Sequence, residues 1–291
     1  DRTAREVLLA QGVRPDCAFE APEGLKASLD SIHRTDGADE IYFVANRSTN
    51  AISARGLFRV TGKVPELWDA VSGARHRLPE WEQKDGYVSV PLEFAPCGSQ
   101  FIVFRERGPE AAGRGPQDAS RGTAPVELCA LSGPWTVTFD PAWGGPEKAV
   151  VFETLQDWTQ RTEPGIRNYS GTAVYRQTAR IARPLPASGG ARVWLDLGLV
   201  RELAEVRVNG TPCGVVWTPP FRVDVTQALK PGDNEVEVRV VNFWYNRVAG
   251  DQALPPEQRL TRTNIRRLQN PGAPLMPSGL SGPVRMLTQS H

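Results

Sequence analysis

The chain of 291 residues lacks an excess of charge of either sign and lacks any long apolar run. Lys and Arg together number 34 and Asp and Glu 33, so the sequence offers no electrostatic footprint for nucleic acid. Apolar runs such as 101–104 are of strand length, far short of the ~20 residues that cross a membrane as a helix. We therefore expect neither a nucleic-acid nor a membrane partner.

Cysteine is scarce and unpaired in sequence. The four cysteines, Cys17, Cys97, Cys129 and Cys213, form no CxxC pair, which argues against a zinc site or a redox motif. We expect the four side chains to be buried thiols, and the sequence alone leaves undecided whether two of them form a disulfide. No DxDxDG-like calcium loop is present. A structural Ca²⁺ bound by oxygens from separate segments is the one cofactor that the sequence still allows, and no other cofactor is expected.

Familiar catalytic motifs are also missing. The sequence contains no GxSxG elbow, no HExxH, no GxxxxGK[ST] and no GxGxxG between a strand and a helix. A Ser-His-Asp triad would depend on His33 or His76, because His291 is the last residue. Neither lies near a nucleophile motif, so both are expected to form local hydrogen bonds.

What the sequence does contain is alternation of apolar residues at period two within residues 191–251. Val193, Leu195 and Leu197 alternate, and the same pattern recurs at 206–208, 221–225 and 236–240. Asn209-Gly210 between two such runs can supply positive φ at both central residues of a tight hairpin turn. The fold class is therefore predicted to be all-β.

Composition predicts how the chain is divided. Residues 1–27 are predicted to form a terminal helix and a connector, with the helix over 1–14 left from a domain that precedes it. Short strands at about ten-residue spacing predict a small Ig-like sandwich over 28–108. Residues 109–127 are rich in Gly, Pro and Ala and are predicted to be a linker. A jelly-roll sandwich of the galactose-binding-like kind is predicted over 128–291.

Aromatic and polar residues cluster at the predicted strand ends and loops of the second domain. Flat aromatic faces stack on sugar rings, and amide, carboxylate and guanidinium groups bond pairs of hydroxyls. The candidate sugar-binding residues are Trp217, Trp244, Tyr245, Asn246, Arg247, Trp158, Tyr169 and Asp251. Two structural alternatives stay open: the tryptophans pack inside the sandwich or on another domain, and Arg247 with Asp251 is an ion pair that locks a loop.

Paired carboxylates suggest a second hypothesis for the function of the chain. Glycoside hydrolysis needs two of them, held about 5–10 Å apart. The acids near aromatic residues are Asp157, Glu163, Asp196, Asp224 and Asp251. Two of these could make the chain a small hydrolase active on its own. A third hypothesis is a purely structural scaffold.

Several segments together resemble glycoside hydrolase family 106, the α-L-rhamnosidases. The segments that carry this resemblance are Ile32-His33-Arg34, 41–46 and 58–62 in the first domain, and 168–176, 195–198, 204–210, 217–221, 224–226 and 244–251 in the second. The second domain resembles more loosely the sugar-binding domain of family 2 enzymes such as β-galactosidases.

The resemblance implies an accessory role. In that family the catalytic barrel and its carboxylates precede the matching region, so no catalytic residue is carried over to this chain. It implies the C-terminal part of a longer, secreted or periplasmic bacterial hydrolase, which braces the barrel and helps to position a carbohydrate that contains rhamnose or comes from another plant or algal polysaccharide. The chain alone is then expected not to be an enzyme. Because it opens at Asp1 without Met, processing or truncation at its front is expected.

Overall fold

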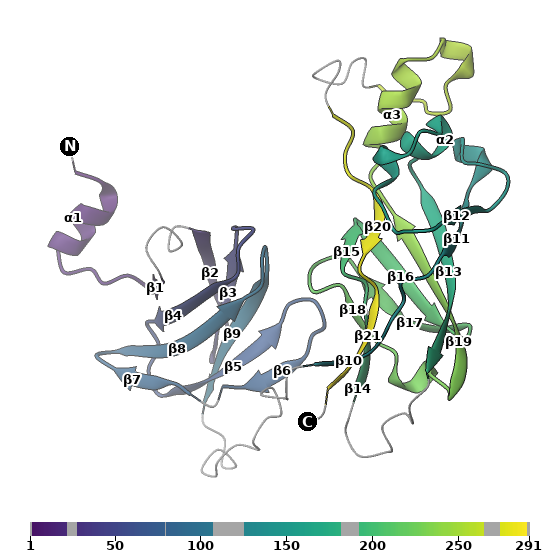
Figure 1. Cartoon of the computed structure of the whole chain (residues 1–291). Coiled ribbons are helices and arrows are strands. Elements are labelled where there is room, and N and C mark those ends of the chain that lie inside the picture. Colours follow the sequence, from purple (N-terminus) through teal and green to yellow (C-terminus); the bar gives the residue numbers. More distant parts are fainter. Residues whose placement is uncertain are drawn as a thin grey trace. The chain divides into compact units, whose positions relative to one another are not determined.

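A computed structural model describes residues 2–21, 28–78, 80–106, 125–181, 192–264 and 274–289. The chain divides into two compact units, residues 1–121 and 122–291 (Figure 1). The predicted linker lies largely outside the described residues, as do residues 22–27 of the predicted connector. Both units consist mainly of antiparallel strands, which confirms the all-β prediction.

Unit 1 is a sandwich of two sheets around its own core. Its sheets have the strand orders β1-β4-β8-β7 and β2-β3-β9-β5-β6. The core between them includes Tyr42, Phe58, Val90, Ile102 and Phe104, all buried. The strands are β1 (Cys17–Glu20), β2 (Leu29–Asp36), β3 (Asp39–Asn46), β4 (Ile52–Phe58), β5 (Lys63–Asp69), β6 (Arg75–Arg77), β7 (Glu82–Lys84), β8 (Tyr87–Phe94) and β9 (Ser99–Glu106).

A short helix, α1 (Ala4–Ala10), precedes the first strand of unit 1. Thr3 and Glu6 form a capping box at its start, and Gly12 follows its end with a φ of 80°. The predicted helix over 1–14 is therefore present but shorter. None of its residues is buried, and Val7, Leu8 and Leu9 expose their apolar side chains.

Unit 2 is a larger sandwich. A six-stranded sheet of order β12-β11-β13-β19-β16-β17 faces a four-stranded sheet of order β10-β21-β14-β18. Its strands are β10 (Val126–Ala130), β11 (Trp135–Phe139), β12 (Val150–Phe152), β13 (Thr172–Ile181), β14 (Arg192–Asp196), β15 (Leu199–Arg201), β16 (Leu203–Val208), β17 (Thr211–Val216), β18 (Arg222–Asp224), β19 (Gly232–Val241), β20 (Gly279–Gly282) and β21 (Arg285–Gln289). The alternating valines of β16 and β19 fill the core, as their pattern predicts.

Short helices connect the strands of unit 2 within the residues that the structure describes. Two are α-helical, α2 (Pro164–Arg167) and α3 (Tyr245–Gln252). Four are 3₁₀ turns: η4 (Pro141–Trp143), η5 (Trp158–Gln160), η6 (Thr226–Ala228) and η7 (Pro256–Gln258). In the part of the chain that the structure describes, no helix is long and apolar enough to cross a membrane.

The Asn209-Gly210 turn joins β16 to β17 as predicted. Both residues have positive φ, 50° and 78°, which matches the twist of the two strands. The Asn209 amide nitrogen donates to the carbonyl of Ala228 and to Oδ1 of Asn234, and its Oδ1 accepts from the backbone nitrogen of Glu235. These bonds join the turn to η6 and to the first residues of β19.

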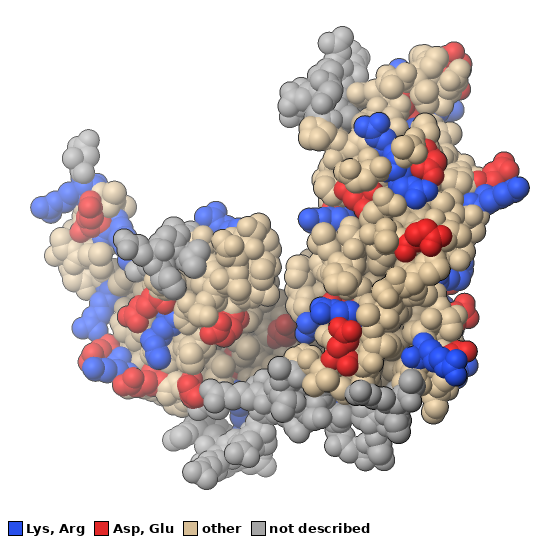
Figure 2. Space-filling view, in the orientation of Figure 1, with Lys and Arg blue, Asp and Glu red and all other residues tan. Residues whose placement is uncertain are grey.

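Charged side chains of both signs are interspersed over the face of the molecule seen in Figure 2. This agrees with the formal net charge of +1. The four cysteines are free.

Candidate functional site

One end of the six-stranded sheet gathers the aromatic loops of unit 2. Phe139, Ala173, Val240, Ala204 and Val216 pair in turn across β11, β13, β19, β16 and β17, so they form one row. The segments that leave or enter the strands beyond this row therefore emerge at the same end of the sheet. Five strands with a spacing of about 4.8 Å make this end roughly 19 Å wide.

Four exposed aromatic residues lie beyond that row, and we call them the aromatic rim: Trp143, Trp217, Phe243 and Trp244. Trp217 is 60% exposed, Trp244 46% and Trp143 37%. The rings of Trp143 and Trp244 meet edge to face, with centroids 4.7 Å apart. The sequence pointed to Trp217 and Trp244 but missed Trp143, whose only signal was its place in a Pro- and Gly-rich loop after a strand.

Local capping holds Trp143 in place. The Asp140 carboxylate accepts from the backbone nitrogen of Ala142 at the start of η4, and Gly144 ends the turn in the left-handed conformation. A Cβ added to Gly144 would clash with Leu260 and crowd the guanidinium of Arg247, so this loop packs closely on the segment around α3. The close packing fixes the position of the Trp143 ring.

Buried amide and hydroxyl groups support Phe243 and Trp244 from below. Asn242 donates to the carbonyl of Tyr169 and to Oγ of Ser278, both at 2.9 Å. Asn246 donates to the same Ser278 oxygen at 3.0 Å and to the carbonyl of Met276 at 2.7 Å. The Ser170 hydroxyl donates to the carbonyl of Phe243. These bonds join three distant chain segments into one base beneath the rim.

Asn246, Arg247 and Asp251 lie on α3 and are buried, which differs from the loop expected there. The Arg247 guanidinium and the Asp251 carboxylate form an ion pair of 3.0 Å, the structural alternative considered above. The other oxygen of Asp251 accepts from the backbone nitrogen and hydroxyl of Thr261. Burial raises the pKa of Asp251, but the bonds from Thr261 and the charge of Arg247 outweigh it and lower that pKa overall.

Two further candidates, Trp158 and Tyr169, are fully buried. Trp158 donates from its indole nitrogen to the hydroxyl of Tyr175, and the Tyr169 hydroxyl donates to the carbonyl of Thr172. The two rings pack edge to face inside the core. A buried ring has no free face for stacking, so neither residue can present its ring to a sugar in this structure. Tyr245, at the start of α3, is half-buried beside the rim.

The remaining acids serve as structural acceptors. Asp157 accepts from the backbone nitrogens of Thr159 and Ser278, and Asp224 accepts from Thr226. Asp196 is buried and bonds Arg222 and Arg285. A hydrogen bond from Arg161 lowers the pKa of Glu163, the opposite of what a general acid requires.

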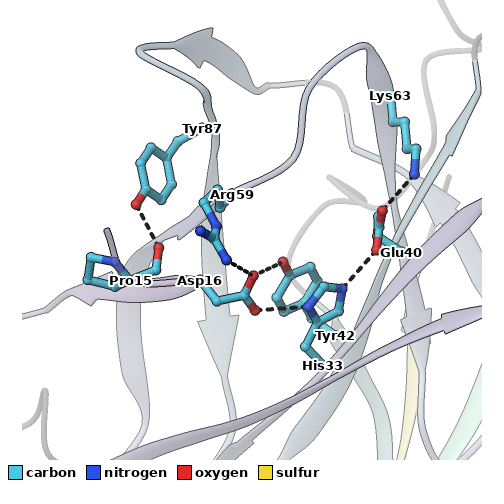
Figure 3. A network of polar contacts seen from close by, with 8 residues as sticks. All are labelled: Pro15, Asp16, His33, Glu40, Tyr42, Arg59, Lys63 and Tyr87. Carbon is cyan, nitrogen blue, oxygen red and sulfur yellow. Dashed lines mark hydrogen bonds and ion pairs between the residues drawn. The ribbon is translucent and has the colours of Figure 1, made fainter. Parts of the chain in front are cut away.

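Unit 1 holds a separate polar network around His33 (Figure 3). Its ring nitrogens lie 2.9 Å from Asp16 and 2.9 Å from Glu40, and the ring stacks on Tyr42 with centroids 4.0 Å apart. Lys63 bonds the other oxygen of Glu40 at 2.8 Å. No nucleophile completes this network in the contacts of the described residues, and it fastens the residue before β1 to strands β2 and β3.

Neighbouring bonds fasten the same segment further. The Tyr87 hydroxyl donates to the carbonyl of Pro15, the Arg14 guanidinium donates to the carbonyl of Asp85, and Arg59 lies 3.5 Å from Asp16. The residues between α1 and β1 are thus held at several points. Among all described residues, no group of three or more His, Cys, Asp or Glu side chains is arranged to hold a metal ion.

Comparisons with known proteins agree with this architecture. A family model for glycoside hydrolase family 106, described as alpha-L-rhamnosidase, matches residues 1–83. A solved rhamnosidase from Novosphingobium sp. PP1Y is 34% identical, with a TM-score of 0.78 over 98% of this chain and 26% of that chain. A curated Formosa agariphila protein called "Putative beta-glucuronidase" is 42% identical over 125 residues, 43% of this chain and 11% of that protein.

This chain therefore spans about a quarter of the solved relative. The predicted resemblance is confirmed: the chain is related to glycoside hydrolases and is similar to the α-L-rhamnosidases of family 106.

Proposed function

We propose that this chain is an accessory, carbohydrate-binding region of an α-L-rhamnosidase-like glycoside hydrolase, in which the aromatic rim contacts a sugar. The observation that carries the proposal is the exposure of Trp143, Trp217 and Trp244 at one end of a rigid sheet. Exposed tryptophans on a soluble domain leave apolar area in water, and they favour a ligand with an apolar face. Sugar rings have such a face on their C–H side.

The rim is suited to an oligosaccharide rather than to one sugar. Trp244 follows β19 and Trp217 follows β17, with β16 between these two strands. The two indoles therefore start about 10 Å apart along the sheet end. Arg201 and Glu202 precede β16 in this interval and supply polar groups for sugar hydroxyls. The base beneath the rim keeps the Phe243 and Trp244 rings in place before binding, which reduces the entropy that they lose on association.

The second half of the proposal is that unit 1 braces the remainder of a larger hydrolase. Helix α1 exposes Val7, Leu8 and Leu9, and Val13 is exposed in the segment after the helix. The segment after α1 is held to the sandwich by the His33 network and its neighbours. A fixed helix with an exposed apolar side is a suitable contact for another domain.

Titration of the 291-residue chain tests the sugar contact. L-rhamnose and rhamnose-containing oligosaccharides are added while tryptophan fluorescence is recorded, and calorimetry gives the Kd. We expect the oligosaccharides to bind, and Trp244→Ala and Trp217→Ala each to weaken binding about tenfold, equivalent to about 1.4 kcal/mol of stacking. Val151→Ala removes an exposed apolar side chain from β12 and should leave the Kd unchanged.

The same chain should be assayed on aryl glycosides. Turnover that disappears in Asp157→Asn or Asp251→Asn, with the fold intact, would favour the small hydrolase. Absence of any fluorescence or calorimetric response to every sugar, with stable variants, would leave the aromatic rim as a scaffold surface and defeat the carbohydrate proposal.

A further inference from the structure

The His33 ring joins the two sheets of unit 1 at their edges. Its strand β2 is an edge strand of the five-stranded sheet, and Asp16 immediately precedes β1, an edge strand of the four-stranded sheet. Nδ1 of the ring lies 2.9 Å from Oδ2 of Asp16, and Nε2 lies 2.9 Å from Oε2 of Glu40 on β3. The contacts can be followed in Figure 3. We call Asp16, His33 and Glu40 the edge clip.

The geometry of the edge clip requires a charged ring. A neutral imidazole has one N–H donor and one nitrogen lone pair, whereas an imidazolium donates from both nitrogens. An ionised carboxylate can only accept. A neutral His33 would therefore set a lone pair against a carboxylate oxygen on one of its two sides, and the imidazolium alone makes both bonds.

Neighbouring donors keep both carboxylates of the clip ionised. Nζ of Lys63 lies 2.8 Å from Oε1 of Glu40, and this bond lowers the pKa of Glu40. Oδ1 of Asp16 accepts from the Tyr42 hydroxyl at 3.3 Å and lies 3.5 Å from the Arg59 guanidinium. A proton on either carboxyl group would compete with these donors. The proton that the clip needs therefore belongs on the His33 ring.

The Tyr42 ring gives the imidazolium a fixed support. Tyr42 is fully buried in the core of unit 1, and the His33 ring lies nearly parallel to it, at an interplanar angle of 8° and a centroid distance of 4.0 Å. The face of an aromatic ring attracts a cation within about 6 Å of its centroid. The stack thus favours the charged form and holds the plane of the imidazole between the two carboxylates.

Histidine is the residue type in this network whose charge ordinarily changes between about pH 5 and 8. Among the described residues, the other titratable groups around the clip are Lys63 of β5, Arg59 after β4, Tyr42 of β3 and Cys17 of β1. Lysine, arginine and carboxylate charges ordinarily stay unchanged over that range. Burial raises the pKa of Tyr42 and of Cys17, which keeps both groups neutral there.

We propose that the edge clip is a proton-operated fastening: the His33 imidazolium holds β1 and the segment before it to the five-stranded sheet, and loss of the ring proton loosens them. The protonated ring has two donors and the neutral ring one, so the clip is strong on the acid side of the histidine titration and weakens as the pH rises through it. In stronger acid the carboxylates take up protons and the clip is lost as well. The inference goes beyond the proposed function, because the clip acts within unit 1 whether or not the aromatic rim binds a sugar.

The loosening should be local. The bonds from Tyr87 to the carbonyl of Pro15 and from Arg14 to the carbonyl of Asp85 involve no group that titrates near neutral pH, so they keep the segment attached. The backbone nitrogen of Arg59 donates to the carbonyl of Asp16 at 2.9 Å and extends the pairing of β1 with β4. Exchange of the Arg59 amide hydrogen therefore reports when Asp16 leaves its place.

NMR spectroscopy of the ¹⁵N-labelled 291-residue chain tests the charge directly. Long-range ¹H–¹⁵N spectra distinguish an imidazolium, in which both ring nitrogens carry hydrogen, from a neutral ring, in which one does not. The His33 signals are assigned as those that disappear in His33→Gln. We expect an imidazolium at about pH 5.5 and a neutral ring at about pH 8.

Hydrogen exchange of the same chain tests the fastening. The exchange rate of the Arg59 amide is divided by its intrinsic rate at each pH, and the resulting protection should fall about fivefold from about pH 5.5 to about pH 8, the difference between a charge-assisted and a neutral bond. The Ile102 amide in the central strand β9 reports opening of the whole unit and serves as the reference.

Variants at the two histidines of unit 1 separate the clip from general effects of pH. His33→Gln carries no charge and should give the low protection at both pH values. His33→Arg is charged at both and should make the protection independent of pH. His76→Gln, a histidine on β6 outside the clip, should keep the wild-type response.

A neutral His33 ring at about pH 5.5 would overturn the proposal. So would equal protection of the Arg59 amide at both pH values in the wild type, or a response to pH that His33→Gln retains. A loss of protection that the Ile102 amide shares in full would assign the change to unfolding of the unit and would overturn it too. None of these readouts depends on a sugar, so the carbohydrate proposal is judged separately.

Discussion

Replacing Asp251 by Asn should destabilise unit 2 strongly, although it changes only one atom of the side chain. The Arg247 and Asp251 side chains are only 7% and 3% exposed, and their charged atoms lie 3.0 Å apart. Coulomb's law at that distance, with an effective dielectric constant of about 20, gives an attraction of about 5.5 kcal/mol. Asn keeps an oxygen for Thr261 but leaves the Arg247 guanidinium buried without its partner charge.

The loss of stability should be smaller than this Coulomb energy. The side chain that replaces Asp251 is neutral, so the variant no longer has to remove a charged carboxylate from water on folding. We expect Asp251→Asn to lower the free energy of unfolding by about 3 kcal/mol, as for other buried pairs that lose one partner. Six of the eight tryptophans belong to unit 2, so urea unfolding followed by tryptophan fluorescence reports mainly on that unit. The two units are fitted as separate transitions.

A matched control pair lies in the six-stranded sheet of unit 2. Arg180 and Asp233 pair across β13 and β19 at 3.9 Å, but their side chains are 83% and 66% exposed. Asp233→Asn should change the free energy of unfolding by less than about 0.5 kcal/mol. A cost below about 1 kcal/mol for Asp251→Asn, close to that of the control, would refute the assignment of Asp251 to a buried structural ion pair with Arg247 and restore it as a candidate sugar ligand.

Three further outcomes are expected. A hydrogen bond from Lys63 lowers the pKa of Glu40 below its usual 4.5, so Glu40→Gln should cost about 1 kcal/mol at neutral pH, and this difference should vanish as the pH falls through the folded-state pKa in acid unfolding curves. Partial burial raises the pKa of the Cys17 thiol to about 12, so iodoacetamide at pH 8 should label the exposed Cys97 before the half-buried Cys17, as mass spectrometry would show; the reverse order would contradict this assignment. Leu8→Ser in α1 should leave the melting temperature of the chain unchanged, because Leu8 is exposed; a drop of several degrees would show that α1 packs on the sandwich.

Alternation and turn chemistry were enough to predict the all-β fold. The apolar residues at 236–240 alternate because one face of β19 fills the core of unit 2, and Asn209-Gly210 forms the predicted turn. Strand β2 was not predicted, because seven of its eight residues are exposed and its sequence, LDSIHRTD, shows no apolar alternation. Its pairing with β3 and the contacts of His33 keep it extended, and such contacts cannot be seen in the sequence of one segment.

The candidate site was harder to predict, because a single sequence does not reveal whether a given aromatic side chain is buried or exposed to solvent. Trp158 and Trp217 both lie in polar, turn-rich surroundings, yet the first is buried and the second exposed. The sequence predicts a loop where α3 forms, because Gly250 weakens the helical pattern and Trp244, the residue at its start, is not a capping residue type. In the structure Trp244 indeed makes no side-chain cap bond. Its stability comes from tertiary bonds such as those of Asn246, which no local pattern reveals.

The Asn209-Gly210 turn has a consequence for the chemical ageing of the protein. In flexible peptides this dipeptide deamidates when the glycine nitrogen attacks the asparagine side-chain carbonyl. Here the amide of Asn209 is engaged by Ala228, Asn234 and Glu235, which hold it away from the conformation needed for ring closure. The most labile dipeptide of the hairpin is thus protected for as long as unit 2 stays folded, and a one-dalton mass gain at Asn209 would record how long each molecule had spent unfolded.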